Sequence, residues 1–403
     1  MDNKSFADFY RRIPLLVKVL VAILLGISLG MVVPGFFVKT MNTLCGIFSQ
    51  LLGFMIPLII VGLVTPAIAR IGRGAGRMLL VTALLAYGFT VFSGLFAYSF
   101  SATLFPHLLE SASLSVLNND SGSFEPYFSI QIPPIMPVMT ALVVSFMMGL
   151  GIAAFDADKL KSIFGEFEQI VTLTIAKVIV PMLPPFIFGL FLDMAACGKV
   201  GPVLAAFVKI IVVIFTMTLV LLILQYIVAG TVTHRNPFKL LRTMLPAYFT
   251  ALGTSSSAAT IPVTLRQTKN NGVRDEIASF VVPLCATIHL SGSTLKITSC
   301  AIALMMMNGM SVEFPQLLGF VLLLGVTMIA APGVPGGAIM AALGILESVL
   351  GFDDSLQAMM ITLYIAMDSF GTACNVTGDG AIALIINNIS EKRNYKLNQQ
   401  KAS

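Results

Sequence analysis

The sequence predicts an all-α polytopic membrane protein with eight transmembrane helices and two re-entrant helical hairpins. Apolar runs of 18 residues or more follow one another along nearly all of the 403 residues. Hydrophobic residues make up 57% of the chain and charged residues 11%, which excludes a soluble enzyme with one membrane anchor. In the second half, polar interruptions recur at a similar spacing inside apolar segments, as internal repeats would place them.

Six ordinary spans are expected in the first half of the chain. Each apolar run is long enough to cross about 30 Å of hydrocarbon. The first run is too long for a signal-peptide core, and no small-residue cleavage site follows it, so we expect it to be a span. The expected spans are 14–34, 42–68, 77–105, 136–155, 170–195 and 202–229.

The distribution of charge predicts which side of the membrane each link faces. Segment 106–134 is polar and contains no Lys or Arg, so it is expected outside. Basic residues gather in the cytoplasmic links and at both termini, which agrees with six spans in the first half and with a net charge of +5. No arginine-rich stripe with interleaved aromatic residues indicates a nucleic-acid partner. The basic groups are Lys4, Arg11 and Arg12, 70–77, 159–161, 235–242 and 392–401.

The second half predicts two units, each made of a re-entrant hairpin and a broken span. The distance from hairpin tip to helix break is roughly 36 residues in the first unit and 38 in the second, which favours inverted repeats. We therefore divide the chain into 1–246 with six helices, 247–390 as the core, and 391–403 as a cytoplasmic tail. The expected segments are a hairpin at 247–270 with its tip at 253–262, a span at 276–308 broken at 289–294, a hairpin at 316–350 broken at 331–337, and a span at 356–386 broken at 368–379.

Such interrupted segments imply a polar ligand at membrane depth. Unpaired backbone groups are costly in hydrocarbon, so irregular backbone persists only where protein buries it or where it lines a wet cavity. The N-termini of half-helices suit an anion, whereas free carbonyls and C-termini suit a cation. A zwitterion accompanied by a cation fits both kinds of end.

Four motifs in the second half resemble the dicarboxylate/amino acid:cation symporters, the glutamate transporter family. They are Gly-Thr-Ser-Ser-Ser-Ala-Ala-Thr-Ile-Pro at 253–262, Val-Pro-Leu-Cys-Ala-Thr-Ile at 282–288, Gly-Val-Pro-Gly at 333–336, and Asn-Val-Thr-Gly-Asp at 375–379. The resemblance covers nearly the whole chain. It implies a non-enzymatic homotrimer in the lipid of a prokaryotic cytoplasmic membrane, in which a transport domain moves like an elevator against a static scaffold. The coupling ion would be Na⁺ or H⁺, with no other cofactor.

The resemblance also assigns roles to individual residues. Asp368 matches the aspartate that holds the substrate amino group, and Asn375 matches the asparagine that binds the α-carboxylate. Asp379 and the backbone of Asn375 match cation ligands of the family, which makes them the candidate Na⁺ ligands, and hard cations do prefer carboxylate and carbonyl oxygens. The candidate substrate residues are Ser256, Ser257, Ser293, Gly333, Val334, Pro335, Gly336, Asp368, Gly371, Thr372 and Asn375; the candidate cation residues are Cys285, His289, Asn375 and Asp379.

Structural roles remain open for the same residues. Asp368 and Asp379 are alternatively polar groups that bond within the helix bundle. Asn375 alternatively links two helices by a hydrogen bond, and the tip serines alternatively cap a helix. His289 is alternatively a core histidine, and Cys285 a small core residue.

One departure from the family bears on the substrate. Members that carry acidic substrates have an arginine three residues after the matched aspartate, and this chain has Gly371 there. Ser255 and Ser369 stand at the alternative arginine positions. A substrate carboxylate would then be desolvated without a partner, so we expect a neutral amino acid and a pocket widened by the glycine. A dicarboxylate or an acidic amino acid is the alternative.

A second departure bears on the coupling ion. The family's Asn-Met-Asp-Gly-Thr is replaced by His-Leu-Ser-Gly-Ser at 289–293, and the third-span partners of that sodium site are missing at 82–86. Lys296 then lies within the span, where its ammonium needs a carbonyl, a carboxylate or water. We interpret it as a possible cation mimic. The alternatives are a lysine that snorkels or pairs with Asp379, and a proton-coupled or sodium-independent carrier.

Two other functions fit the sequence less well. An intramembrane protease would need Asp368 and Asp379 to share a proton, which their separation along one broken helix does not favour. A channel would use the same broken helices as a filter, so anion conductance is at most a side activity.

Overall fold

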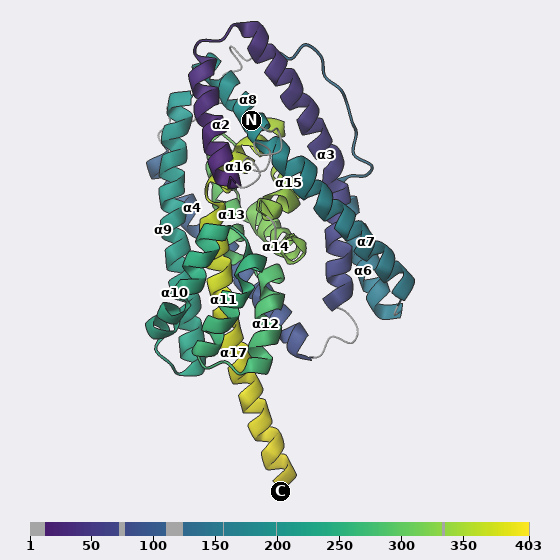
Figure 1. Ribbon diagram of the computed structural model, residues 1–403, viewed down its shortest axis with the longest axis vertical. Helices are drawn as coiled ribbons and strands as arrows, with labels where there is room; N and C mark the ends of the chain where they lie inside the picture. The colour runs from purple at the N-terminus through teal and green to yellow at the C-terminus, as the bar shows by residue number, and fades with distance from the viewer. Residues whose placement is uncertain are drawn as a thin grey trace, which may run out of the picture.

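The computed structural model describes residues 13–71, 77–109, 124–155, 157–198, 200–332 and 335–402. Within these ranges every regular element is a helix (Figure 1). Residues 1–12, most of link 70–77, the middle of loop 106–134 and the tip residues Gly333 and Val334 lie outside them. The first half contains α2 (Leu15–Gly30), α3 (Gly35–Ile71), α4 (Arg77–Leu108), α6 (Val138–Phe155), α7 (Asp158–Thr174), the π-helical turn η1 (Ile175–Ile179), α8 (Val180–Ala196) and α9 (Val200–Thr233).

Each of the six expected spans corresponds to a helix or a continuous helical run, and the first and the fifth differ from the expected length. The first, expected over 14–34, is the 16-residue α2, which is shorter than the helices counted next as membrane-spanning. In the part of the chain that the structure describes, seven helices are long and apolar enough to cross a membrane. The fifth expected span began at 170, but the continuous run of α7, η1 and α8 begins at Asp158. The added turns carry Lys159, Lys161 and Glu166, which interrupt an apolar run without interrupting a helix.

The first hairpin also begins earlier than its apolar segment. It consists of α10 (Pro237–Thr254) and α11 (Ser257–Asn270), so the expected boundary at 246 lies inside α10. The Asn236 side chain accepts hydrogen bonds from the amides of Phe238 and Lys239, which together with Pro237 starts the helix ten residues before 247. At the tip, Ser255 adopts a left-handed conformation with φ of 50°.

The two helix breaks are shorter than the polar motifs predict. The first broken span consists of α12 (Asp275–Ile288) and α13 (Ser291–Met307), so only 289–290 interrupt it. The second consists of α16 (Asp354–Ala366) and α17 (Asp368–Ala402), interrupted at Met367 alone. The expected break over 368–379 is therefore wrong: these residues form the first turns of α17, because a buried helix retains Gly, Thr and Asn when neighbouring helices pack on it.

The second hairpin and the broken spans form the centre of the molecule. The hairpin consists of α14 (Phe314–Ala330) and α15 (Gly337–Leu350). In Figure 1, α3, α6 and α7 lie on one side and α9 on the other, with α13, α14 and α15 between them. In the apolar 18-residue stretch of α17, 94% is buried inside the molecule, against 33% for the corresponding stretch of α6 and 39% for that of α9. Helices of the first half such as these therefore carry most of the outward apolar surface.

Candidate substrate and cation sites

A cavity of about 270 Å³ lies where the two hairpin tips approach the break between α16 and α17. Both hairpins thus reach the same place from different segments, as the repeated interruptions predict. Of the candidate substrate residues, Pro335 and Asp368 line this cavity. The lining residues are Ile13, Pro14, Leu15, Leu16, Gly253, Thr254, Ser255, Pro335, Ile365, Asp368 and Ser369.

The tip of the first hairpin brings the N-terminus of α11 close to this cavity, because residues 253–255 line it. Ser256 is the N-cap of α11, and its Oγ accepts a hydrogen bond of 3.3 Å from the amide of Ala259. Ser257 is the first residue of that helix and is buried. A capping role for Ser256 is therefore present, and the free amides of the first turn remain donors for an anion.

Asp368 joins the second hairpin to the helix break. Its Oδ2 accepts a hydrogen bond of 3.0 Å from the amide of Gly336, which is the N-cap of α15 and has φ of 74°. Glycine is favoured at that positive φ, since a side chain would be strained there. The backbone carbonyl of Asp368 also accepts a bond from Thr372 Oγ1 at 3.0 Å.

Lys296 pairs with Asp368, and neither structural alternative for this lysine is correct. Its Nζ lies 3.6 Å from Asp368 Oδ1, and the side chain is only 1% exposed, so it does not snorkel. Asp379 has a different partner, His289. The Nζ also donates to the carbonyl of Met367 at 3.2 Å and lies 3.9 Å from the centre of the Tyr364 ring.

Gly371 does not widen the cavity, contrary to expectation. A Cβ placed on Gly371 would lie 2.5 Å from Lys296 Nζ and would overlap Lys296 Cε. The space over the glycine is therefore filled by the lysine side chain, which reaches it from α13. Sequence analysis did not bring the two residues together because 75 positions separate them.

A second network connects the beginning of α13 to α17. Asn375 Oδ1 accepts a bond of 2.7 Å from the amide of Gly292, and its Nδ2 donates to Ser293 Oγ at 3.1 Å. Tyr364 donates its hydroxyl to the same Ser293 oxygen at 3.0 Å. The helix-linking role of Asn375 is thus present, and one amide hydrogen remains for a ligand.

The other candidate cation residues gather around Asp379, one helical turn beyond Asn375 along α17. Asp379 follows Asn375 by four positions on α17, so both side chains face the same way. Asp379 Oδ1 lies 2.9 Å from His289 Nδ1, and both side chains are almost fully buried. Cys285 is a buried free thiol whose carbonyl accepts the His289 amide, so it lies beside this pair through the last turn of α12.

Two functional candidates were missed by sequence analysis. Tyr364 contacts both Lys296 and Ser293, and its position four residues before Asp368 was an available signal. Gln225 donates to Ser291 Oγ at 2.8 Å, while its Oε1 is buried without a hydrogen-bond partner. A lone amide within the apolar run of α9 was the available signal for Gln225.

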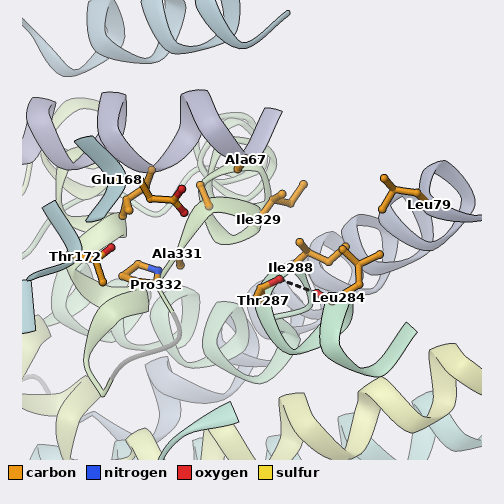
Figure 2. Close-up of a pocket in the computed structure, with 12 residues that line it drawn as sticks. Ala67, Leu79, Glu168, Thr172, Leu284, Thr287, Ile288, Ile329, Ala331 and Pro332 are labelled. Atoms are coloured by element: carbon orange, nitrogen blue, oxygen red, sulfur yellow. Dashed lines mark hydrogen bonds between the residues drawn. The ribbon is translucent and has the colours of Figure 1, made fainter. Parts of the chain in front are cut away.

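A separate cavity of about 350 Å³ lies between first-half and second-half helices. Figure 2 shows Glu168 and Thr172 of α7 on one side together with Pro332, and Leu284 and Thr287 of α12 on the other. Thr287 donates to the Leu284 carbonyl at 2.8 Å, as the dashed line marks. None of the candidate substrate or cation residues lines it.

Buried charges at two helix breaks, next to two hairpin tips among membrane-spanning helices, define a multi-pass membrane transporter rather than a soluble binding protein. Residues 15–389 match the sodium:dicarboxylate symporter family. The chain belongs to that family.

Individual relatives have different substrates in their names. The chain is 25% identical to the serine/threonine transporter SstT of Acinetobacter baumannii (strain AYE), over 92% of this chain and 96% of that protein. It is 24% identical to SstT of Streptococcus thermophilus (strain CNRZ 1066), over 98% and 99%. It is 31% identical to excitatory amino acid transporter 1 of Rattus norvegicus, over 68% of this chain and 53% of that protein, so it spans about half the length of the rat transporter.

Proposed function

We propose that the protein carries an amino acid with an uncharged side chain across the cytoplasmic membrane, together with a cation. The observation that carries this proposal is the position of Asp368, which lines the cavity between the hairpin tips and meets Gly336 of the second hairpin. A carboxylate in this position attracts the ammonium of an amino acid.

The substrate carboxylate would bind on the opposite side of the cavity. The N-terminus of α11 offers the amide hydrogen of Ser257, whereas the amide of Ser256 donates to Thr254 Oγ1 at 3.4 Å, and the helix dipole favours an anion there. Asn375 contributes its remaining amide hydrogen, and Ser293 holds Asn375 in place. Thr372 and the tip residues Gly333–Gly336 complete the set of substrate contacts that the family resemblance assigns.

The charge around the cavity favours a neutral side chain. Among the described residues that line it, Asp368 is the one with a charged side chain, and none is cationic. The ammonium of Lys296 lies 3.6 Å from Asp368 Oδ1, and that carboxylate already balances it. A second carboxylate on the substrate would therefore be buried without a partner. The name of the two SstT relatives, serine/threonine transporter, agrees with this preference, whereas the rat relative is named for excitatory amino acids.

The coupling cation would bind near Asp379. Its carboxylate and the backbone around Asn375 provide the oxygen ligands that Na⁺ prefers. The family description favours Na⁺. A proton on the buried pair of Asp379 and His289 is the alternative, because the same two side chains lie within hydrogen-bond distance, at 2.9 Å.

An elevator movement of the second-half core, within a homotrimer, is the transport mechanism we propose. The cavity between α7 and α12 supports it, because two surfaces that slide need not pack tightly. The start of α10, the end of α11 and the link to α12 carry Lys239, Arg242, Arg266, Lys269 and Arg274. By the positive-inside rule we expect this end of the three helices to face the cytoplasm, and we propose the same side for both termini.

Uptake into proteoliposomes tests this function. A panel of radiolabelled amino acids is offered under imposed Na⁺ or pH gradients. Saturable uptake of neutral amino acids that depends on one of the gradients is expected. Gradient-independent flux without saturation would instead indicate a channel.

A further inference from the structure

The ammonium of Lys296 is surrounded by the kinds of group that bind a free cation: a carboxylate, backbone carbonyls and an aromatic ring. Its ammonium lies 3.6 Å from Asp368 Oδ1, 3.2 Å from the Met367 carbonyl and 3.5 Å from the Asp368 carbonyl. The two carbonyls belong to the break that follows α16, where the helix dipole places partial negative charge. The face of Tyr364, 3.9 Å away, adds a further attraction for a cation.

The ammonium lies behind Asp368 rather than in the cavity. Asp368 lines the cavity and has a side chain that is 11% exposed, whereas Lys296 is 1% exposed and does not line it. The bare Cα of Gly371 is what allows the lysine to lie there, because a Cβ would overlap its side chain. The substrate ammonium therefore approaches Asp368 from the cavity while the lysine holds the opposite side.

Both carboxylate oxygens of Asp368 have a partner within the protein even when no substrate is bound. One carboxylate oxygen faces the lysine, and the other accepts the amide of Gly336 at the start of α15. The second hairpin is thereby joined to the helix break through Asp368. Without the lysine, a closed hairpin over an empty cavity would bury an unbalanced carboxylate, which hydrocarbon strongly disfavours.

We propose that Lys296 is a tethered counter-ion that neutralises Asp368 in the unloaded transporter. The second hairpin can then close over the empty cavity, and the unloaded core returns across the membrane without carrying a cation in the opposite direction. The proposal rests on the proposed function. It adds that the site itself permits net transport, and not only the exchange of one substrate molecule for another, because the core can return without substrate.

Two assays on the same proteoliposomes separate the unloaded return from the other steps. Exchange measures entry of labelled substrate into vesicles that contain unlabelled substrate, so the core crosses loaded in both directions. Net uptake measures entry into vesicles without substrate, so the core must return empty. In wild type, net uptake should proceed equally well whether the vesicle contains Na⁺, K⁺ or choline.

Lys296→Met should lower net uptake at least about tenfold more than exchange, because only the empty core depends on the tethered charge. Thr298→Val is the matched control: Thr298 is equally buried on α13, and its hydroxyl has no hydrogen-bond partner among the described residues. The control should leave the ratio of the two rates unchanged. A purely structural role for Lys296 would lower both rates by the same factor.

A chemical rescue gives a second test. Lys296→Ala removes the side chain and leaves space beside Asp368, so ethylammonium inside the vesicle should restore net uptake in this variant. In wild type, ethylammonium should leave the ratio of net uptake to exchange unchanged. Tetramethylammonium is the control cation, because it has no N–H group to donate to the Met367 carbonyl as the lysine does.

Three results would overturn the proposal: equal losses of exchange and net uptake in Lys296→Met, no rescue of Lys296→Ala by ethylammonium, or a wild type that needs a cation inside the vesicle for net uptake. The last result requires no variant, so misfolding of a variant does not protect the proposal. Failure of the proposed function is distinct, because wild type would then exchange no neutral amino acid at all.

Discussion

The two repeated units have the same architecture, but one buries two basic side chains and the other buries two acidic ones. The unit of the first hairpin, α12 and α13 contributes His289 and Lys296. The unit of the second hairpin, α16 and α17 contributes Asp368 and Asp379. Among the residues that the structure describes, these four are the buried Lys, Arg, His, Asp and Glu side chains, and each base pairs with an acid of the other unit.

This difference shows how a symmetric backbone supports two different sites. Both helix breaks provide free backbone groups at membrane depth, yet the pair of Lys296 and Asp368 lies at the substrate cavity and the other pair does not. Asp379, which meets His289, follows Asp368 by eleven positions and therefore lies about three turns further along α17. Neither unit can bury its own charges alone, because an unpaired buried charge is costly. The pairs therefore hold the units together as well as shaping the sites, and the following variants separate these two effects.

Asp368→Asn should have the largest effect. It removes the attraction for the substrate ammonium, so binding should weaken at least about a hundredfold, and it leaves Lys296 unpaired, which costs about 3–5 kcal/mol of stability. Substrate binding and thermal unfolding in detergent measure the two effects. The double variant Lys296→Met with Asp368→Asn should regain stability without regaining binding. Near-native affinity in Asp368→Asn would remove this residue from the site.

A substrate switch should follow when the cation is moved from α13 to α17. Gly371→Arg alone places two cations in one space, so we expect it to destabilise the protein. Combined with Lys296→Ala, the guanidinium has room and should raise the preference for aspartate or glutamate by about tenfold or more. Competition between labelled substrates measures the shift. A wild type that already prefers glutamate would contradict our interpretation of Gly371.

Asp379→Asn should lower the affinity for the coupling ion by about tenfold or more, since the Asp379 carboxylate is the charged ligand in its pair with His289. Uptake is measured against Na⁺ at fixed pH and against pH at fixed Na⁺. His289→Gln keeps the carboxylate and should have a smaller effect on Na⁺. If neither dependence changes in Asp379→Asn, the pair of Asp379 and His289 is structural only.

Tyr364→Phe should have the smallest effect. It removes the hydrogen bond to Ser293, worth about 1 kcal/mol or about fivefold in substrate affinity, and keeps the ring beneath Lys296. The ratio of net uptake to exchange should stay at the wild-type value. A changed ratio would mean that the hydroxyl, and not only the ring, supports the lysine.

Sequence analysis predicted the type and order of the elements better than their limits. The polar tip at 253–262 correctly indicated a hairpin, because such a segment is too short and too polar to span a membrane. The start of the same hairpin was placed too late, since Lys239 and Arg242 obscure the helix in a hydropathy pattern. The break over 368–379 was overestimated for a related reason: packing against α10, α12 and α13 keeps these polar residues helical.

The sequence by itself determined the membrane class, the two hairpins, and the fact that Asp368, Asp379, His289 and Lys296 lie at membrane depth. These follow from local properties, namely the length of apolar runs, the turn residues and the cost of charge in hydrocarbon. Only the tertiary structure decided the partners: Lys296 with Asp368 and His289 with Asp379, and the lysine rather than a substrate above Gly371. Pairing depends on how α13 packs against α17, and a contact across 72 or 90 positions leaves no periodic signal in one sequence.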